Sequence, residues 1–304
     1  MRVETDRHSG FCGGVIRAIN RAESFLREHS GSNLYSLGSI VHNDAELERL
    51  RSLGLVAIDY DDLSQAQDAG GHTLLIRAHG EPPATYLKAR ALGFEIVDCT
   101  CPVVLDLQKS IREAYVRLCS EPGGGTIVIF GQPGHAEVLG LMGQATGAVV
   151  VKDMAMLLDA VESGKVDTGR PVEIFSQTTK NPAEYAAVCA FLEEKMGPLL
   201  RAHNTICTQV ASRQSQLVEF AQKHDVVIFV SGKDSSNGKV LCGLCKSANI
   251  RTFHIESAQE LRPEWFRADD NVGVCGATST PRWLLEQVAS GVLDIDKNFP
   301  NFAL

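Results

Sequence analysis

The stretch Gly10-Phe11-Cys12-Gly13-Gly14-Val15 places a cysteine where an extended segment gives way to a helix. Apolar side chains follow it at helical spacing: Val15, Ile19, Ala22 and Leu26. The same unit recurs as Asp98-Cys99-Thr100-Cys101-Pro102-Val103 and as Asn204-Thr205-Ile206-Cys207-Thr208-Gln209. One such cysteine in each third of the chain indicates an internal repeat.

Each repeat continues with two apolar, strand-like runs that end in polar loops. The first run leads to residues 41–43, 134–137 or 235–237, and the second leads to residues 78–80, 177–179 or 278–280. A proline follows each second loop, as is typical of the first turn of a helix. Strands that alternate with helices predict parallel sheets, whose ligands bind beyond the carboxyl ends of the strands.

The predicted fold class is therefore α/β, with mainly parallel sheets. We expect three small α/β domains in a pseudo-threefold trefoil around one central site, with boundaries at 1–100, 101–206 and 207–304, the last including a C-terminal tail. The third repeat ends without a cysteine of its own, so the N-terminal strand before Cys12 is expected to take that place.

Composition narrows the classes of function. The 304-residue chain carries a net charge of -8, which argues against nucleic acid as the main partner. Its N-terminus does not resemble a signal peptide, and its apolar runs are too short to span a membrane. We therefore expect a cytoplasmic protein. Nine cysteines, an odd number, indicate free thiols or metal ligands rather than a disulfide framework.

The three repeated cysteines are candidate metal ligands. A thiolate at a helix N-terminus is stabilised by the helix dipole, and three soft thiolates suit an iron-sulfur cluster better than a hard cation. Cys12, Cys101 and Cys207 are thus predicted to hold a 4Fe-4S cluster with one open iron. The alternative is that these cysteines are small buried apolar residues. Cys99 is the one competitor for the cluster.

The remaining cysteines lack this placement. Cys119, Cys189 and Cys275 are predicted to be structural. The Cys242-Gly243-Leu244-Cys245 segment has a spacing found in zinc sites and redox pairs. No second such pair accompanies it in the sequence, so a structural role is favoured.

The polar loops carry donors for a phosphate or diphosphate. Imidazoles, hydroxyls and an amide recur at equivalent strand ends: His42, His79, His135, Ser235, Ser236, Asn237 and Ser279. Glu137 follows His135 closely and is a candidate proton donor, and Thr178 is a candidate relay or hydroxyl contact. The alternative for residues 177–179 is simple capping of the helix that follows.

Taken in order, these motifs resemble the 4-hydroxy-3-methylbut-2-enyl diphosphate reductase family. The matching segments are Gly10-Phe11-Cys12, Val41-His42-Asn43, Ala78-His79-Gly80, Thr100-Cys101-Pro102, Gly134-His135 with Glu137, Gln177-Thr178-Thr179, Thr205-Ile206-Cys207, Ser235-Ser236-Asn237 and Ser279 before Pro281. The resemblance runs from about Arg2 to Val288. It departs from the family pattern at Cys99, at residues 210–212 and after Pro102, none of which is a proposed ligand.

The resemblance implies a reductive dehydroxylation that yields isopentenyl and dimethylallyl diphosphate, the last step of the non-mevalonate isoprenoid pathway. It also implies a ferredoxin or flavodoxin as electron donor, with Glu137 supplying the proton and Thr178 contacting the substrate hydroxyl. Two other interpretations remain open. One is a cluster-bearing enzyme resembling quinolinate synthase, and the other is a non-catalytic iron or redox sensor.

Overall fold

The computed structural model describes residues 1–297 except 30, 32, 42, 66–68 and 234. The chain divides into two compact units. The first unit contains Met1–Ile16, Val41–Arg49 and the segment from Ser212 onward, and the second contains Arg17–Ile40 and Leu50–Ala211.

The described residues form three four-stranded sheets, in each of which all strands pair in parallel. The strands are β1 (Arg2–Thr5), β2 (Leu34–Leu37), β3 (Leu55–Ile58), β4 (Thr73–Ile76), β5 (Glu95–Asp98), β6 (Thr126–Phe130), β7 (Val149–Val151), β8 (Val172–Ser176), β9 (Leu200–His203), β10 (Val226–Val230), β11 (Thr252–Ile255) and β12 (Asn271–Gly276). Their orders are β3-β2-β4-β5, β7-β6-β8-β9 and β11-β10-β12-β1. The order is the same in all three sheets once β1 is counted as the fourth strand of the last repeat.

Helices connect and cover these strands. They are α1 (Gly13–Glu28), α2 (Asp44–Ser52), α3 (Tyr60–Gln65), α4 (Pro83–Ala91), α5 (Pro102–Ser120), α6 (Ala136–Met142), α7 (Met154–Glu162), α8 (Pro182–Met196), α9 (Thr208–Ala211), α10 (Arg213–Gln222), α11 (Ser236–Ala248) and α12 (Arg282–Lys297), with 3-10 turns η1 (Gly197–Leu199), η2 (Ala258–Glu260) and η3 (Pro263–Trp265). Proline is the first residue of α4, α5 and α8. A backbone N–H at this position would have no hydrogen-bond acceptor within the helix, so proline loses no helical hydrogen bond there.

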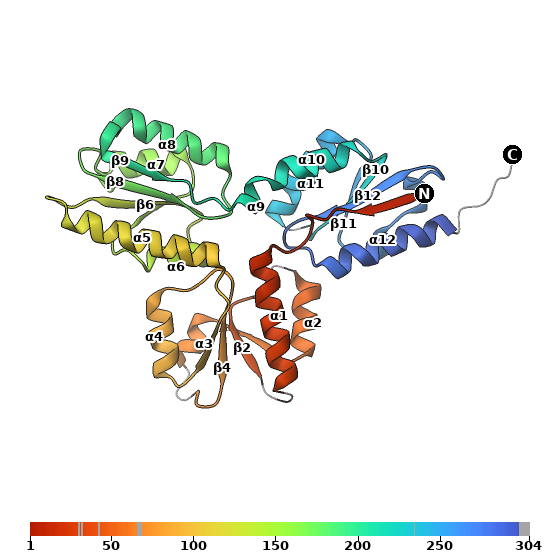
Figure 1. Cartoon of the computed structure of the whole chain (residues 1–304), viewed down its shortest axis with the longest axis horizontal. Coiled ribbons are helices and arrows are strands. Elements are labelled where there is room, and N and C mark those ends of the chain that lie inside the picture. The colour runs from red at the N-terminus through yellow and green to blue at the C-terminus, as the bar shows by residue number, and fades with distance from the viewer. Residues whose placement is uncertain (30, 32, 42, 66–68, 234, 298–304) are drawn as a thin grey trace. The chain divides into compact units, whose positions relative to one another are not determined.

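The sheet of β6–β9 lies between two helical layers, with α5 and α6 on one face and α7 and α8 on the other (Figure 1). Successive β6 residues alternate between these layers: Val128 and Phe130 pack toward α7 and α8, whereas Ile127 and Ile129 pack toward α5 and α6. Burial on both faces explains the continuous apolar run of β6, because both sets of alternating side chains need an apolar residue.

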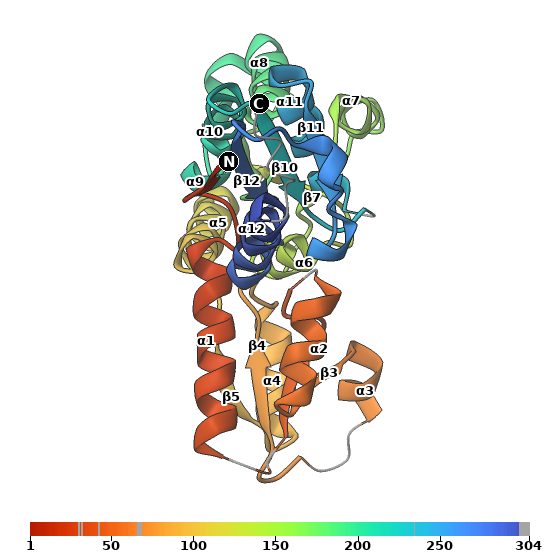
Figure 2. The same ribbon diagram turned by 90° about the vertical axis from the view of Figure 1, so that its right-hand side faces the viewer.

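The sheet of β10–β12 and β1 is built in the same way. Val226, Ile228 and Val230 pack with α12, and Val227 and Phe229 pack with α10 and α11. In the sheet of β2–β5, α3 and α4 lie on one side of the strands and α1 lies on the other (Figures 1 and 2). Leu74 and Ile76 of β4 are fully buried against the layer of α3 and α4.

The α/β class and the parallel sheets predicted from the repeats are confirmed. The N-terminal strand also closes the third repeat as expected, because β1 pairs in parallel with β12 from Arg2 opposite Asn271 to Thr5 opposite Val274. The pseudo-threefold arrangement and the boundaries at 100/101 and 206/207 stay predictions. The predicted boundaries separate the three sheets, except that β1, from residues 1–100, belongs to the sheet of β10–β12. They do not coincide with the division into two compact units.

Among the described helices, none combines the length and the apolar character needed to cross a bilayer.

Two isoleucines of the first unit give a matched test of the core. Ile228 of β10 is fully buried against α12, whereas Ile250 is 94% exposed. Ile228→Ala is expected to lower the free energy of unfolding by about 2–5 kcal/mol, because it removes buried methylenes and leaves a cavity. Ile250→Ala is expected to change it by no more than about 0.5 kcal/mol. Urea denaturation followed by circular dichroism measures both, and equal losses would contradict the assigned core.

Candidate functional site

Glu137 is a carboxylate buried at the carboxyl end of β6. The preceding His135 is the N-cap of α6, and its Nδ1 accepts a hydrogen bond from the backbone N–H of Glu137 (3.1 Å). Although it lies in the first turn of a helix, the Glu137 side chain is only 2% exposed. The short α6 therefore turns a carboxylate inward at a strand end.

Thr178 supplies both hydrogen-bond partners of that carboxylate. Its backbone N–H donates to Oε1 of Glu137 (2.7 Å) and its hydroxyl donates to Oε2 (2.8 Å). Burial raises the pKa of Glu137, and the two bonds from Thr178 oppose that rise without reversing it. A carboxyl group with a raised pKa can hold a proton closer to neutral pH and release it to a bound substrate.

Cys207 is fastened to the same loop. Its backbone N–H donates to the carbonyl oxygen of Thr178 (2.9 Å), and its own carbonyl accepts from the N–H groups of Val210 and Ala211 as α9 begins. Two residues earlier, the hydroxyl of Thr205 accepts from the N–H of Ser176 (2.8 Å) and donates to the carbonyl of the same residue (2.7 Å). Ser176 ends β8, so the Cys207 loop is held against the end of that strand.

Cys101 is held in the same way against the loop that follows β4. Its backbone N–H donates to the carbonyl of Ala78 (3.0 Å), and the residue is the N-cap of α5. The adjacent His79 ring meets the His135 ring edge to face, with centroids 5.3 Å apart. The second unit therefore brings six predicted residues into one connected series: Cys101, His79, His135, Glu137, Thr178 and Cys207.

A buried carboxylate, Glu81, and its partner Tyr60 lie next to the His79 loop, and neither was singled out from the sequence. The hydroxyl of Tyr60 donates to Oε2 of Glu81 (2.5 Å), and Arg77 Nε lies 3.9 Å from Oε1 of the same carboxylate. Burial raises the pKa of Glu81, with Tyr60 and Arg77 acting in the opposite direction. The only sequence signal was the position of Glu81 between the His79-Gly80 turn and two prolines.

The first unit holds the other predicted substrate residues. Ser235 is the N-cap of α11, and its hydroxyl accepts from the N–H of Gly238 (3.0 Å). The side-chain amide of Asn237 donates to the hydroxyl of Thr278 (3.3 Å), which connects the start of α11 with the half-buried loop that contains Ser279. Ser236 is the first residue of α11. His42 lies outside the described residues.

Cys12 directly precedes α1, with its carbonyl accepting from the N–H of Ile16 (3.0 Å). All three predicted cluster ligands are thus half-buried thiols next to a helix start, a donor set that suits a soft iron-sulfur centre. Within the described residues, no group of three His, Cys, Asp or Glu side chains forms a metal site. Cys12 belongs to the first unit and the other two to the second, so the cluster stays a prediction.

Cys99 differs from its neighbour Cys101. It is 3% exposed, and burial, followed by the charge of Asp98, raises the pKa of its thiol to about 11. Such a thiol stays protonated and is a poor metal ligand. Cys242, Cys245 and Cys275 are packed in the apolar layer formed by α10, α11, β10 and β12, as a structural role requires.

Comparison with known proteins identifies the class. The LytB protein family matches residues 3–292. The 4-hydroxy-3-methylbut-2-enyl diphosphate reductase of Bacteroides fragilis is 44% identical over 96% of this chain and 97% of its own, and that of Porphyromonas gingivalis is 45% identical over 95% and 98%. A solved structure of (E)-4-hydroxy-3-methyl-but-2-enyl diphosphate reductase, described as the terminal enzyme of the non-mevalonate pathway, shares 33% identity and a TM-score of 0.78 over 97% of this chain and all of its own.

These relatives are named as reductases, a class of oxidoreductase, and the solved structure shares the α/β fold of this chain. The predicted enzyme class is confirmed. The chain belongs to the LytB protein family.

The raised pKa of Glu137 predicts a pH dependence of stability. Relative to an unfolded value of about 4.3, the folded state binds the proton more tightly, so the stability from this group is present at low pH and lost as pH rises through the folded pKa. The melting temperature of Glu137→Gln minus that of the wild type should therefore increase with pH between about 4 and 8.

Glu173 provides the control with the opposite sign. Burial alone would raise the pKa of Glu173, but hydrogen bonds from Arg117 and His203 outweigh it and lower that pKa. The ionised Glu173 carboxylate stabilises the folded state at pH values above its unfolded pKa. This contribution is lost as the pH falls through the pKa of Glu173 in the folded state. Glu173→Gln should therefore be least stable relative to wild type at neutral pH. If both variants showed the same pH trend, the assignment of a raised pKa to Glu137 would be wrong.

Proposed function

We propose that this chain reduces 4-hydroxy-3-methylbut-2-enyl diphosphate to isopentenyl diphosphate and dimethylallyl diphosphate. In this reaction the allylic C–O bond breaks, a C–H bond forms, and two electrons and two protons are consumed as water leaves. The observation that carries the proposal is the buried Glu137–Thr178 pair, which adjoins Cys207 in a chain 44% identical to a reductase of that name.

Glu137 is proposed as the donor of the proton that converts the substrate hydroxyl into water. Its raised pKa favours the protonated acid before reaction, and the two hydrogen bonds from Thr178 stabilise the carboxylate left afterwards. The hydroxyl of Thr178 lies within hydrogen-bonding distance of the acid, so it can orient the substrate hydroxyl or pass the proton to it. The Glu137–Thr178 pair thus supplies both orientation and acid chemistry.

The diphosphate end is proposed to bind the donors at the other strand ends. These residues are His42, His79, His135, Ser235, Ser236, Asn237 and Ser279. Imidazoles, hydroxyls and an amide can hydrogen-bond to phosphate oxygens from strand-end loops. The edge-to-face contact of the His79 and His135 rings supports the proposal that both face one ligand. In a chain with a net charge of -8, such local donors offset the general repulsion of an anionic substrate.

Cys12, Cys101 and Cys207 are proposed to hold a 4Fe-4S cluster with one iron free of protein ligands. When bound, that cluster would supply Lewis-acid binding of the substrate hydroxyl and a path for the two electrons. The residues themselves provide three half-buried thiols, each next to a helix start. A ferredoxin or flavodoxin is proposed as the electron donor, and the cytoplasm as the location.

The activity is tested with protein purified without oxygen. Wild-type protein is expected to oxidise reduced methyl viologen only when the diphosphate substrate is added, and the products are identified by mass spectrometry. Glu137→Gln is expected to lower kcat by a factor of about 10²–10⁴, the usual contribution of a general acid. Thr179→Val, next to the proposed contact Thr178, serves as the control and should retain activity. Substrate-independent oxidation, or none, would favour the sensor interpretation.

Two cysteines in one loop test the ligand assignment. Cys101→Ala is expected to lower the iron bound per protein and the visible absorbance of the cluster, because it removes a ligand. Cys99→Ala is expected to leave both unchanged, because the buried Cys99 thiol has a pKa of about 11. Iron analysis and Mössbauer spectroscopy measure the difference, and loss of iron on changing Cys99 would contradict the assignment.

A further inference from the structure

The loops of Cys207 and Cys12 each have a hydroxyl group that fastens them to a neighbouring strand. In the second unit, Thr205 binds both backbone groups of Ser176, the last residue of β8. In the first unit, the hydroxyl of Ser9 accepts from the N–H of Gly276 (2.8 Å) and lies 3.4 Å from the carbonyl oxygen of the same residue, which ends β12. The two hydroxyl residues have similar positions in their loops: Ser9 lies three residues before Cys12, and Thr205 lies two residues before Cys207.

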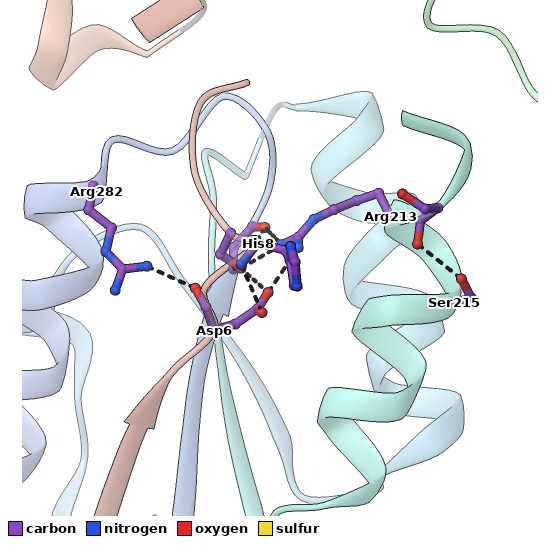
Figure 3. Close-up of polar contacts among 8 residues, drawn as sticks. Asp6, His8, Arg213, Ser215 and Arg282 are labelled. Atoms are coloured by element: carbon purple, nitrogen blue, oxygen red, sulfur yellow. Dashed lines mark hydrogen bonds and ion pairs between the residues drawn. The ribbon is translucent and has the colours of Figure 1, made fainter. Parts of the chain in front are cut away.

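The loop of Ser9 is longer than that of Thr205 and has an additional fastening. Asp6 follows β1 directly, and its carboxylate accepts from the Ser9 hydroxyl (2.8 Å) and from the backbone N–H of His8 (3.1 Å). Arg282 of α12 donates to the backbone carbonyl of Asp6 (2.9 Å) from the other side (Figure 3). The segment between β1 and Cys12 is therefore folded around the Asp6 carboxylate.

Arg213, the first residue of α10, completes this cluster. Its guanidinium donates to Asp6 Oδ2 (2.9 Å), to the Ser9 hydroxyl and to the carbonyl of Gly276 (2.9 Å) (Figure 3). Arg213 is 3% exposed and Asp6 is 5% exposed, so neither charge is balanced by water. Breaking such a buried pair leaves an uncompensated charge, which makes its geometry costly to change.

We infer that Arg213 is a positioning residue for Cys12. It acts through Asp6 and Ser9, which hold the loop that presents the Cys12 thiol. The inference rests on the proposed function, in which Cys12 is a cluster ligand, and adds a role for a residue that contacts neither substrate nor metal. Arg213 follows Cys207 by six positions, so a single side chain connects the segment after one ligand with the segment before another.

The first unit offers a matched control. Arg251 donates to both oxygens of a buried aspartate, Asp270 (2.8 and 2.7 Å), and, like Arg213, to a backbone carbonyl, here that of Trp265 (3.0 Å). Asp270 immediately precedes β12, at the end of that strand opposite to Gly276. Arg251→Lys therefore perturbs an equivalent pair in the same unit without touching the loop of Cys12.

The test uses the full chain, purified without oxygen, and two readouts that do not depend on turnover. These are the rate of iron release to a chelator and the alkylation rate of each cysteine, resolved by peptide mass spectrometry. Arg213→Lys and Ser9→Ala are expected to raise the alkylation rate of Cys12 relative to Cys207 by about tenfold, because the loop loses charge-assisted hydrogen bonds. The rate of iron release should increase in the same two variants. Arg251→Lys should change neither that rate nor the alkylation ratio of Cys12 to Cys207.

Equal behaviour of Arg213→Lys and Arg251→Lys would overturn the inference, as would a uniform rise at all three cysteines, which reports general unfolding. Ser9→Ala breaks no ion pair, so it remains informative if Arg213→Lys folds poorly. Wild-type protein that binds no iron and does not oxidise viologen would refute the proposed function alone. The alkylation of Cys12 would still report whether Arg213 holds its loop.

Discussion

Parallel pairing brings the ends of neighbouring strands to one edge in each sheet. Loops that leave that edge lie next to one another however far apart they are in sequence. This is how the loop after β8 and the helix start after β6 come together, placing Thr178 against Glu137 across 41 positions. An antiparallel sheet would send alternate loops to opposite edges and separate them.

Within this arrangement, backbone hydrogen bonds do much of the positioning. The N–H of Cys101 binds Ala78, two residues past β4, and the N–H of Cys207 binds Thr178, two residues past β8. The repeat therefore conserves a bond that needs no particular side chain. A buried ion pair is added where the loop is longer, as with Asp6 and Arg213 before Cys12. The longer loop needs this because more free backbone has to be ordered.

Apolar periodicity and residue spacing in the sequence were enough to predict the strands and several helix starts. Apolar runs such as that of β6 predicted buried parallel strands, and cysteines before helical patterns predicted the helix starts at Cys101 and Cys207. The sequence did not predict the pair of Tyr60 with Glu81 or that of Asp6 with Arg213. The latter joins residues 207 positions apart, and an ion pair between distant loops leaves no local pattern. The division into two compact units was missed for the same reason, since it depends on long-range contacts.

Glu137 and Glu173 show how far the surroundings decide the chemistry of one residue type. Both are buried glutamates of the second unit. Arg117 and His203 compensate the charge of Glu173 and lower its pKa, which suits a carboxylate that holds structure together. Within the described part of the chain, Glu137 accepts hydrogen bonds from the neutral donors of Thr178, and its pKa is raised. The neutral donors of Thr178 leave the raised pKa of Glu137 in place, as the proposed role of this residue as a proton donor requires.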